Sequence, residues 1–162
     1  MVLLIYVLNK MESVTVVPIK FKVHIDLIKE FHSLQMDYAQ HNKIFALSNN
    51  EMFAVMVEFM YAAYKQEKIL KMCPSDFSES VIRPGKRKAT SRTVAFPYAD
   101  VIIFKIGKEI ADKYMDVMFS YISNDPKDNV FNTHHSRTHF FYDFLGYMAT
   151  RKNDLMKFVS AK

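Results

Sequence analysis

The sequence predicts a mainly helical protein with one short two-stranded antiparallel β-ribbon, in which two fused strand–helix–helix units form an intramolecular pseudo-dimer. The composition favours packed helices, because the 162 residues include only 3 Gly and 5 Pro but 14 Phe, 9 Tyr and 11 Met. Apolar residues recur first at two-residue and then at three- to four-residue steps, which is the order of a strand followed by helices. This order occurs twice along the chain and indicates an internal repeat.

The first strand is predicted from strict alternation. Apolar residues between positions 19 and 25 alternate with Lys20, Lys22 and His24. A period of two residues is typical of a strand with one buried and one exposed face. The exposed face of this strand is therefore expected to be basic.

Two helices are expected to follow this strand. Asp26 stands where a helix N-cap belongs, and apolar residues then recur at helical spacing, which predicts a helix over about 26–40. Ser48 and Glu51 have the spacing of a capping box, in which each side chain bonds the backbone of the other residue. A second helix should begin at Glu51 or just before it, and its apolar character predicts a buried position.

The second copy of the repeat has the same order of elements. Residues 21–31 lie over 104–114 without a gap, and after a loop of different length residues 48–60 lie over 136–148. In the second copy we expect a strand over 101–106, a helix over about 108–123, a polar loop at 124–129 and a last helix opening at Ser136. By register, Lys20, Lys22 and His24 correspond to Ile103, Lys105 and Gly107.

A basic segment separates the two copies. Half of the ten residues at 83–92 are Lys or Arg, and none is acidic. The segment is interpreted either as a solvated connector or as an arm that contacts phosphates. The predicted organisation is a first unit at 14–70, a basic linker at 71–93 and a second unit at 94–158, with one core shared by the two units.

Charge, cysteine content and the first residues restrict the class of protein. A formal charge of +5 and a pI of about 9.2 favour polyanionic partners. The single cysteine, Cys73, cannot form an internal disulfide, which suits a reducing compartment and predicts a cytoplasmic protein. Residues 1–8 are apolar but too short to span a bilayer, so we expect no membrane anchor. They are interpreted as an extra edge strand, unless translation starts at Met11.

The order of strand, helix and capped helix resembles the ribbon-helix-helix family of DNA-binding proteins, in its tandem form with two copies in one chain. The resemblance covers residues 14–65 and 94–152. It implies that the two strands pair antiparallel and that the ribbon enters the DNA major groove, where strand side chains reach base edges. The loops between the helices are longer than the family's tight turn, and the second strand is largely apolar.

The resemblance assigns roles to individual residues. The base-reading role falls on Lys20, Lys22, His24, Ile103 and Lys105, and Gly107 is an additional candidate. By resemblance, contacts to DNA phosphates fall on the second-helix N-termini, at Ser48, Asn49, Asn50, Ser136, Arg137 and Thr138. The charge of the linker adds Lys86, Arg87 and Lys88 as further predicted phosphate contacts. The unequal strand faces imply an asymmetric DNA site. The alternatives to base reading are that Lys20 and Lys22 lie on a solvated strand face and that Ile103 is buried.

Competing chemistry finds little support in the sequence. His134, His135 and His139 have no Cys or carboxylate close in sequence to complete a metal site. There is no glycine-rich phosphate loop and no nucleophile motif, so neither an enzyme nor a cofactor is expected.

The resulting hypothesis is sequence-specific binding of double-stranded DNA, with self-association of chains on DNA as a further expectation. The role expected from the resemblance is a transcriptional regulator, such as a repressor, or an accessory protein of a nucleoprotein complex on a plasmid or phage. The alternative is a protein–protein assembly module that uses the same fold without binding DNA.

Overall fold

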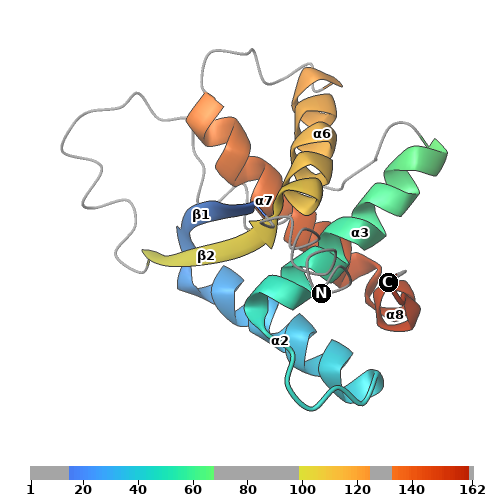
Figure 1. Ribbon diagram of the computed structural model, residues 1–162. Helices are drawn as coiled ribbons and strands as arrows, with labels where there is room; N and C mark the ends of the chain where they lie inside the picture. The colour runs from blue at the N-terminus through green and yellow to red at the C-terminus, as the bar shows by residue number, and fades with distance from the viewer. Residues whose placement is uncertain (1–14, 68–98, 125–132, 161–162) are drawn as a thin grey trace, which may run out of the picture.

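The structure is a computed structural model that describes residues 15–67, 99–124 and 133–160 (Figure 1). Residues 1–8, the linker at 71–93 with Lys86, Arg87 and Lys88, and all of the predicted polar loop at 124–129 except its first residue lie outside these ranges. The described elements, in chain order, are β1 Val16–His24, α2 Ile25–His41, α3 Asn49–Glu67, β2 Ala99–Gly107, α6 Lys108–Asn124, α7 Thr133–Thr150 and α8 Lys152–Lys157. The prediction of a mainly helical protein with a two-stranded antiparallel ribbon is confirmed.

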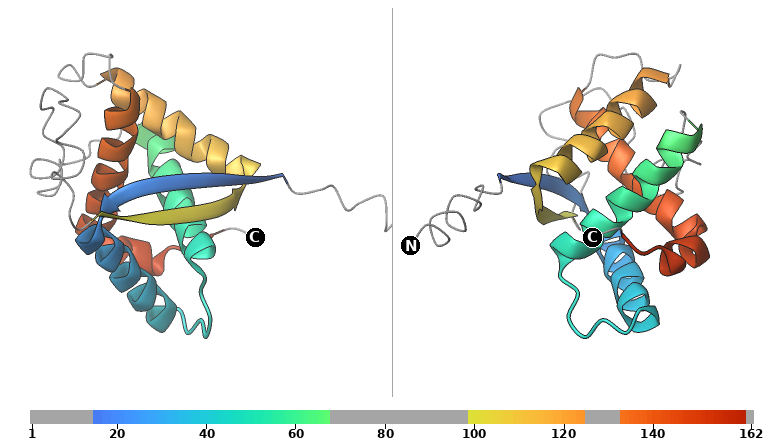
Figure 2. Two further views of the ribbon diagram at one scale, coloured as in Figure 1. Left: turned by 90° about the vertical axis from the view of Figure 1, so that its left-hand side faces the viewer. Right: turned by 45° about the vertical axis from the view of Figure 1, so that its right-hand side comes forward.

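The ribbon consists of β1 and β2, paired antiparallel over nine residues each. Val16 lies opposite Gly107 at one end, and Lys20 lies opposite Ile103 at the centre. Alternation along each strand divides the side chains between two faces. The inner face carries buried apolar residues, which are Phe21, Val23, Ile102, Phe104 and Ile106. Figure 2 shows the helices on this inner side and the ribbon at one side of the molecule.

The elements of the two halves match in length and spacing. Both strands have 9 residues, and the helices that follow them directly both have 17. Every residue of β1 and α2 therefore has a counterpart 83 positions later, from Val16 with Ala99 to His41 with Asn124. The next helices, α3 and α7, have 19 and 18 residues.

Helix boundaries confirm one expected cap and correct two others. In the capping box, Ser48 N–H donates to the Glu51 carboxylate at 2.8 Å and Glu51 N–H donates to the Ser48 hydroxyl at 3.2 Å. The expected Asp26 cap is wrong, because α2 begins at Ile25 and the His24 ring nitrogen accepts from Asp26 N–H. The last long helix begins at Thr133, three residues before the predicted Ser136.

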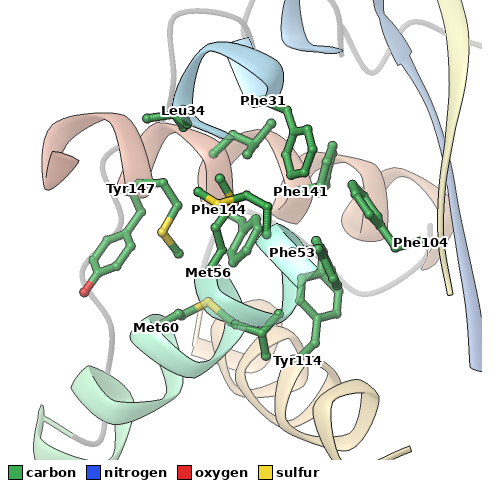
Figure 3. Packing of buried hydrophobic residues seen from close by; sticks show 14 of the residues in the cluster. Phe31, Leu34, Phe53, Met56, Met60, Phe104, Tyr114, Phe141, Phe144 and Tyr147 are labelled. Atoms are coloured by element: carbon green, nitrogen blue, oxygen red, sulfur yellow. The ribbon is translucent and has the colours of Figure 1, made fainter. Parts of the chain in front are cut away.

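Aromatic rings from both halves form the core (Figure 3). Phe104 of β2 stacks on Phe53 of α3 with ring centroids 4.2 Å apart, and Phe21 of β1 stacks on Phe141 of α7 at 4.0 Å. Each strand thus packs its central phenylalanine on a helix from the other half of the chain. The two halves share one continuous core, in which one charged side chain, Asp143, is buried and accepts from the Tyr121 hydroxyl.

Candidate nucleic-acid interface

The outer face of the ribbon is exposed and basic. Lys20, Lys22 and Lys105 are solvent-exposed on this face, and its described side chains include no carboxylate. Ile103 lies among them with 47% of its surface exposed, so the alternative that it is buried is wrong. Four of the five predicted base-reading residues therefore lie together and face solvent.

The strand register separates the lysines from one another. Lys20 lies opposite Ile103, Lys22 opposite Val101 and Lys105 opposite Pro18. Like charges directly opposite each other destabilise a ribbon, and each lysine here has an apolar partner instead. Lys22 lies opposite position 101, four residues from Lys105 along β2, which corresponds to roughly 13 Å along the ribbon.

His24, the fifth predicted base-reading residue, is half-buried at the end of β1. Its Nδ1 accepts from Asp26 N–H at 3.2 Å and lies 3.4 Å from the Asp26 carboxylate. Its backbone N–H donates to the Tyr142 hydroxyl at 3.0 Å. These contacts give His24 a structural part in starting α2 and in holding the end of β1 against α7.

The N-terminus of α3 lies beside the free edge of β2. The Asn50 side-chain oxygen accepts from the backbone N–H of Lys105 at 2.8 Å, across 55 positions of sequence. The sequence marked Asn50 only as a phosphate contact. Its role as a clamp on the ribbon depends on a tertiary contact that no local pattern encodes.

The same helix end has limited capacity for an anion. The capping box uses the N–H groups of Ser48 and Glu51, which leaves Asn49 and Asn50 as backbone donors. Hydrogen bonds from the backbone and the hydroxyl of Ser48 lower the pKa of Glu51, so its carboxylate is charged at neutral pH. A phosphate at this position is attracted by the helix N-terminus but repelled by the Glu51 carboxylate.

Replacing Asn50 with alanine should lower the free energy of unfolding by about 1 kcal/mol, because it removes one exposed hydrogen bond from the ribbon edge. Chemical denaturation measures this loss. Asn50→Asp is the matched control, since it retains the acceptor oxygen and should preserve most of the stability. Equal losses in both variants would contradict the clamp.

The second predicted phosphate cluster lies inside a helix. Because α7 begins at Thr133, the backbone N–H groups of Ser136, Arg137 and Thr138 fall within the helix rather than at its open end. The earlier helix start removes the physical reason for a backbone phosphate site at these positions. The side chains of Arg137, which is exposed, and Thr138, which is partly exposed, remain accessible.

Among the described residues, no group of three or more metal-ligating side chains comes together, and no helix is long and apolar enough to span a membrane. Comparison of the chain with protein-family models, with curated proteins and with solved structures finds no match.

Proposed function

We propose that this protein binds double-stranded DNA by placing the outer face of the β1–β2 ribbon in the major groove. The observation that carries the proposal is an exposed two-stranded ribbon whose outward side chains are basic or apolar, with Lys20, Lys22 and Lys105 among them. The major groove is about 12 Å wide and admits a two-stranded ribbon. Lysine donors suit the guanine acceptors, and Ile103 suits a thymine methyl group.

The proposal includes an intramolecular pseudo-dimer of two strand–helix–helix units. The equal lengths of the matching elements and the constant offset of 83 residues support it. The crossed stacks also support it, because exchanging the two halves converts the Phe21–Phe141 stack into the Phe104–Phe53 stack. Lys20 and Ile103 are separated by the same offset and pair directly, so the axis of this symmetry passes through their pair.

This symmetry predicts how the DNA site is organised. Lys22 and Lys105 are equivalent positions on either side of the central pair. Their separation of roughly 13 Å along the ribbon matches about four base-pair steps, which suggests two symmetric guanine contacts. The centre of the site is asymmetric, because Lys20 and Ile103 differ in chemistry.

Phosphate contacts are assigned to groups that flank the ribbon. Asn49 and Asn50 offer backbone donors at the start of α3, and Arg137 offers an exposed guanidinium near the start of α7. The linker residues Lys86, Arg87 and Lys88 remain predicted contacts outside the described residues. The wider role, a transcriptional regulator or a nucleoprotein accessory protein, rests on the ribbon-helix-helix resemblance.

The proposal is tested by fluorescence anisotropy with a labelled duplex taken from beside the protein's own gene, against a shuffled duplex, over a salt series. We expect affinity that falls steeply with salt and a preference for the native duplex at every salt concentration. Absence of binding at low salt would overturn the proposal and favour the assembly module. Equal affinity for both duplexes would contradict sequence-specific recognition.

A further inference from the structure

A groove of about 590 Å³ runs along the free edge of β1, between this strand, α6 and α7. Its apolar lining includes Ile19 of the strand and Met115 and Met118 of α6. Basic residues, which are Lys20, Lys22, Lys108 and Arg137, also belong to its lining. One acidic residue, Asp112, belongs to the lining and is paired with Lys108, so the remaining cations make the groove positive.

The backbone of β1 directs polar groups toward this groove. Residue pairs in an antiparallel ribbon alternate between pairs that bond each other and pairs whose N–H and C=O groups point to the outer edges. Lys105 N–H points outward to Asn50, so Lys105 and Pro18 form a pair whose backbone groups point to the outer edges. Because the two kinds of pair alternate, the pairs that contain Lys20 and Lys22 also point their backbone groups outward. The N–H and C=O groups of Lys20 and Lys22 therefore face the groove.

The two edges of the ribbon differ in how they are covered. On the β2 edge, the Asn50 side chain accepts from Lys105 N–H. In the sequence repeat Thr138 takes the place of Asn50, and it lines the groove on the β1 side. Within the described ranges the outward N–H groups of Lys20 and Lys22 donate to no acceptor. The β1 edge therefore retains strand-pairing groups at the centre of the ribbon.

A buried hydroxyl adds a second sign of a ligand. Tyr114 lines the groove with 1% of its surface exposed, and its hydroxyl has no hydrogen-bond partner among the described residues. Burial raises the pKa of this hydroxyl well above its usual value, and the positive charge of Arg137 acts in the opposite direction. Leaving a buried hydroxyl unpaired costs free energy, which a ligand with an acceptor would recover.

We propose that the β1 edge binds an extended peptide segment of a partner protein, in which acidic and apolar residues alternate, as a third strand of the ribbon. Main-chain bonds to Lys20 and Lys22 would hold such a strand in register. Its apolar side chains enter the groove toward Met115, and its acidic side chains lie on the outer face beside the two lysines. Lysine and proline on an edge discourage unselective pairing, so the acidic residues supply the selectivity.

The added strand regulates the ribbon, and this part of the inference rests on the proposed function. A third strand widens the ribbon beyond the two strands that the major groove admits. Its carboxylates also neutralise Lys20 and Lys22, which are proposed to face DNA. The partner segment and DNA should therefore exclude each other.

The probe is a fluorescein-labelled seven-residue peptide that alternates Glu and Val, titrated into the full chain without DNA. A peptide with the same residues in blocks, four Glu and then three Val, is the control for charge alone. We expect the alternating peptide to bind at least about tenfold more tightly than the blocked one. Equal affinities, or no binding of the alternating peptide at about 1 mM, would overturn the proposal.

Backbone methylation tests the strand geometry with the unaltered protein. N-methylation of every second amide in one phase removes the donors that face β1, and affinity should fall about tenfold. N-methylation in the other phase leaves those donors intact and should change the affinity little. Equal effects of the two phases would contradict strand addition.

A groove variant locates the site. Met115→Glu places a negative charge in the groove and should weaken the alternating peptide about tenfold. His32→Glu is the matched control, because it makes the same charge change at the position of α2 that corresponds to Met115. An equal loss in both variants would place the peptide elsewhere.

Competition with DNA separates this inference from the proposed function. If the peptide binds and displaces the native duplex, both proposals are supported. Peptide binding by a chain that binds no DNA supports the groove and overturns the DNA proposal. If the chain binds DNA but not the peptide, the DNA proposal is supported and the proposed peptide site is overturned.

Discussion

Replacing Phe104 with alanine is expected to lower the free energy of unfolding by about 3–5 kcal/mol. The Phe104 side chain is fully buried and contacts rings from four other elements, with Phe53 stacked at 4.2 Å and Phe31 at 5.1 Å. Its removal leaves a cavity between the ribbon and the helices that neighbouring rings cannot close without leaving their own contacts.

Urea unfolding measures this loss as a shift of the midpoint at unchanged slope. Phe45→Ala is the matched control, because Phe45 lies in the loop between α2 and α3 with its side chain fully exposed. That variant should stay within about 0.5 kcal/mol of the unaltered protein. A loss below about 1 kcal/mol for Phe104→Ala would show that this ring is not central to the core.

A chain carrying both Lys22→Glu and Lys105→Glu should bind its DNA about 100- to 1,000-fold more weakly. Each lysine is proposed to contact a guanine, and a good contact of this kind is worth about 1–3 kcal/mol of discrimination. Both side chains are exposed and lie opposite apolar residues, so their replacement should leave the fold intact.

The control for net charge reverses two lysines that are distant from the ribbon. Lys65 is exposed near the end of α3 and Lys157 near the end of α8, away from the strands in Figure 1. Reversing both makes the same change in charge and should weaken binding only modestly. Comparable losses in the two double variants, measured by anisotropy on the native duplex, would contradict recognition by the ribbon face.

Much of the fold can be predicted from the periodicity of apolar residues in this sequence. The two-residue alternation that ends at His24 and the helical spacing after it predict the strand, the helix and the division into faces, because burial acts directly on side-chain order. The capping box at Ser48 is local and was equally predictable. The outward position of Lys20 and Lys22 follows from the same alternation.

What depends on distant contacts could not be predicted. Because Ser136 aligns with Ser48, the repeat predicts that the last long helix begins at Ser136. In the structure this helix begins at Thr133, so Ser136 lies inside it. His24 replaces Asp26 as a cap because its ring reaches back to the helix, a use of histidine that residue preferences do not favour. The clamp by Asn50 and the open edge beside Tyr114 both arise where segments far apart in sequence meet.

The crossed stacks also govern how the chain folds. Phe21 stacks on Phe141, 120 positions later, and His24 N–H donates to Tyr142, 118 positions later. We therefore expect the ribbon to close late in folding, and the loop-closure entropy of this distant pairing to slow folding. Neither half can protect its strand alone, so both halves should melt in a single cooperative transition.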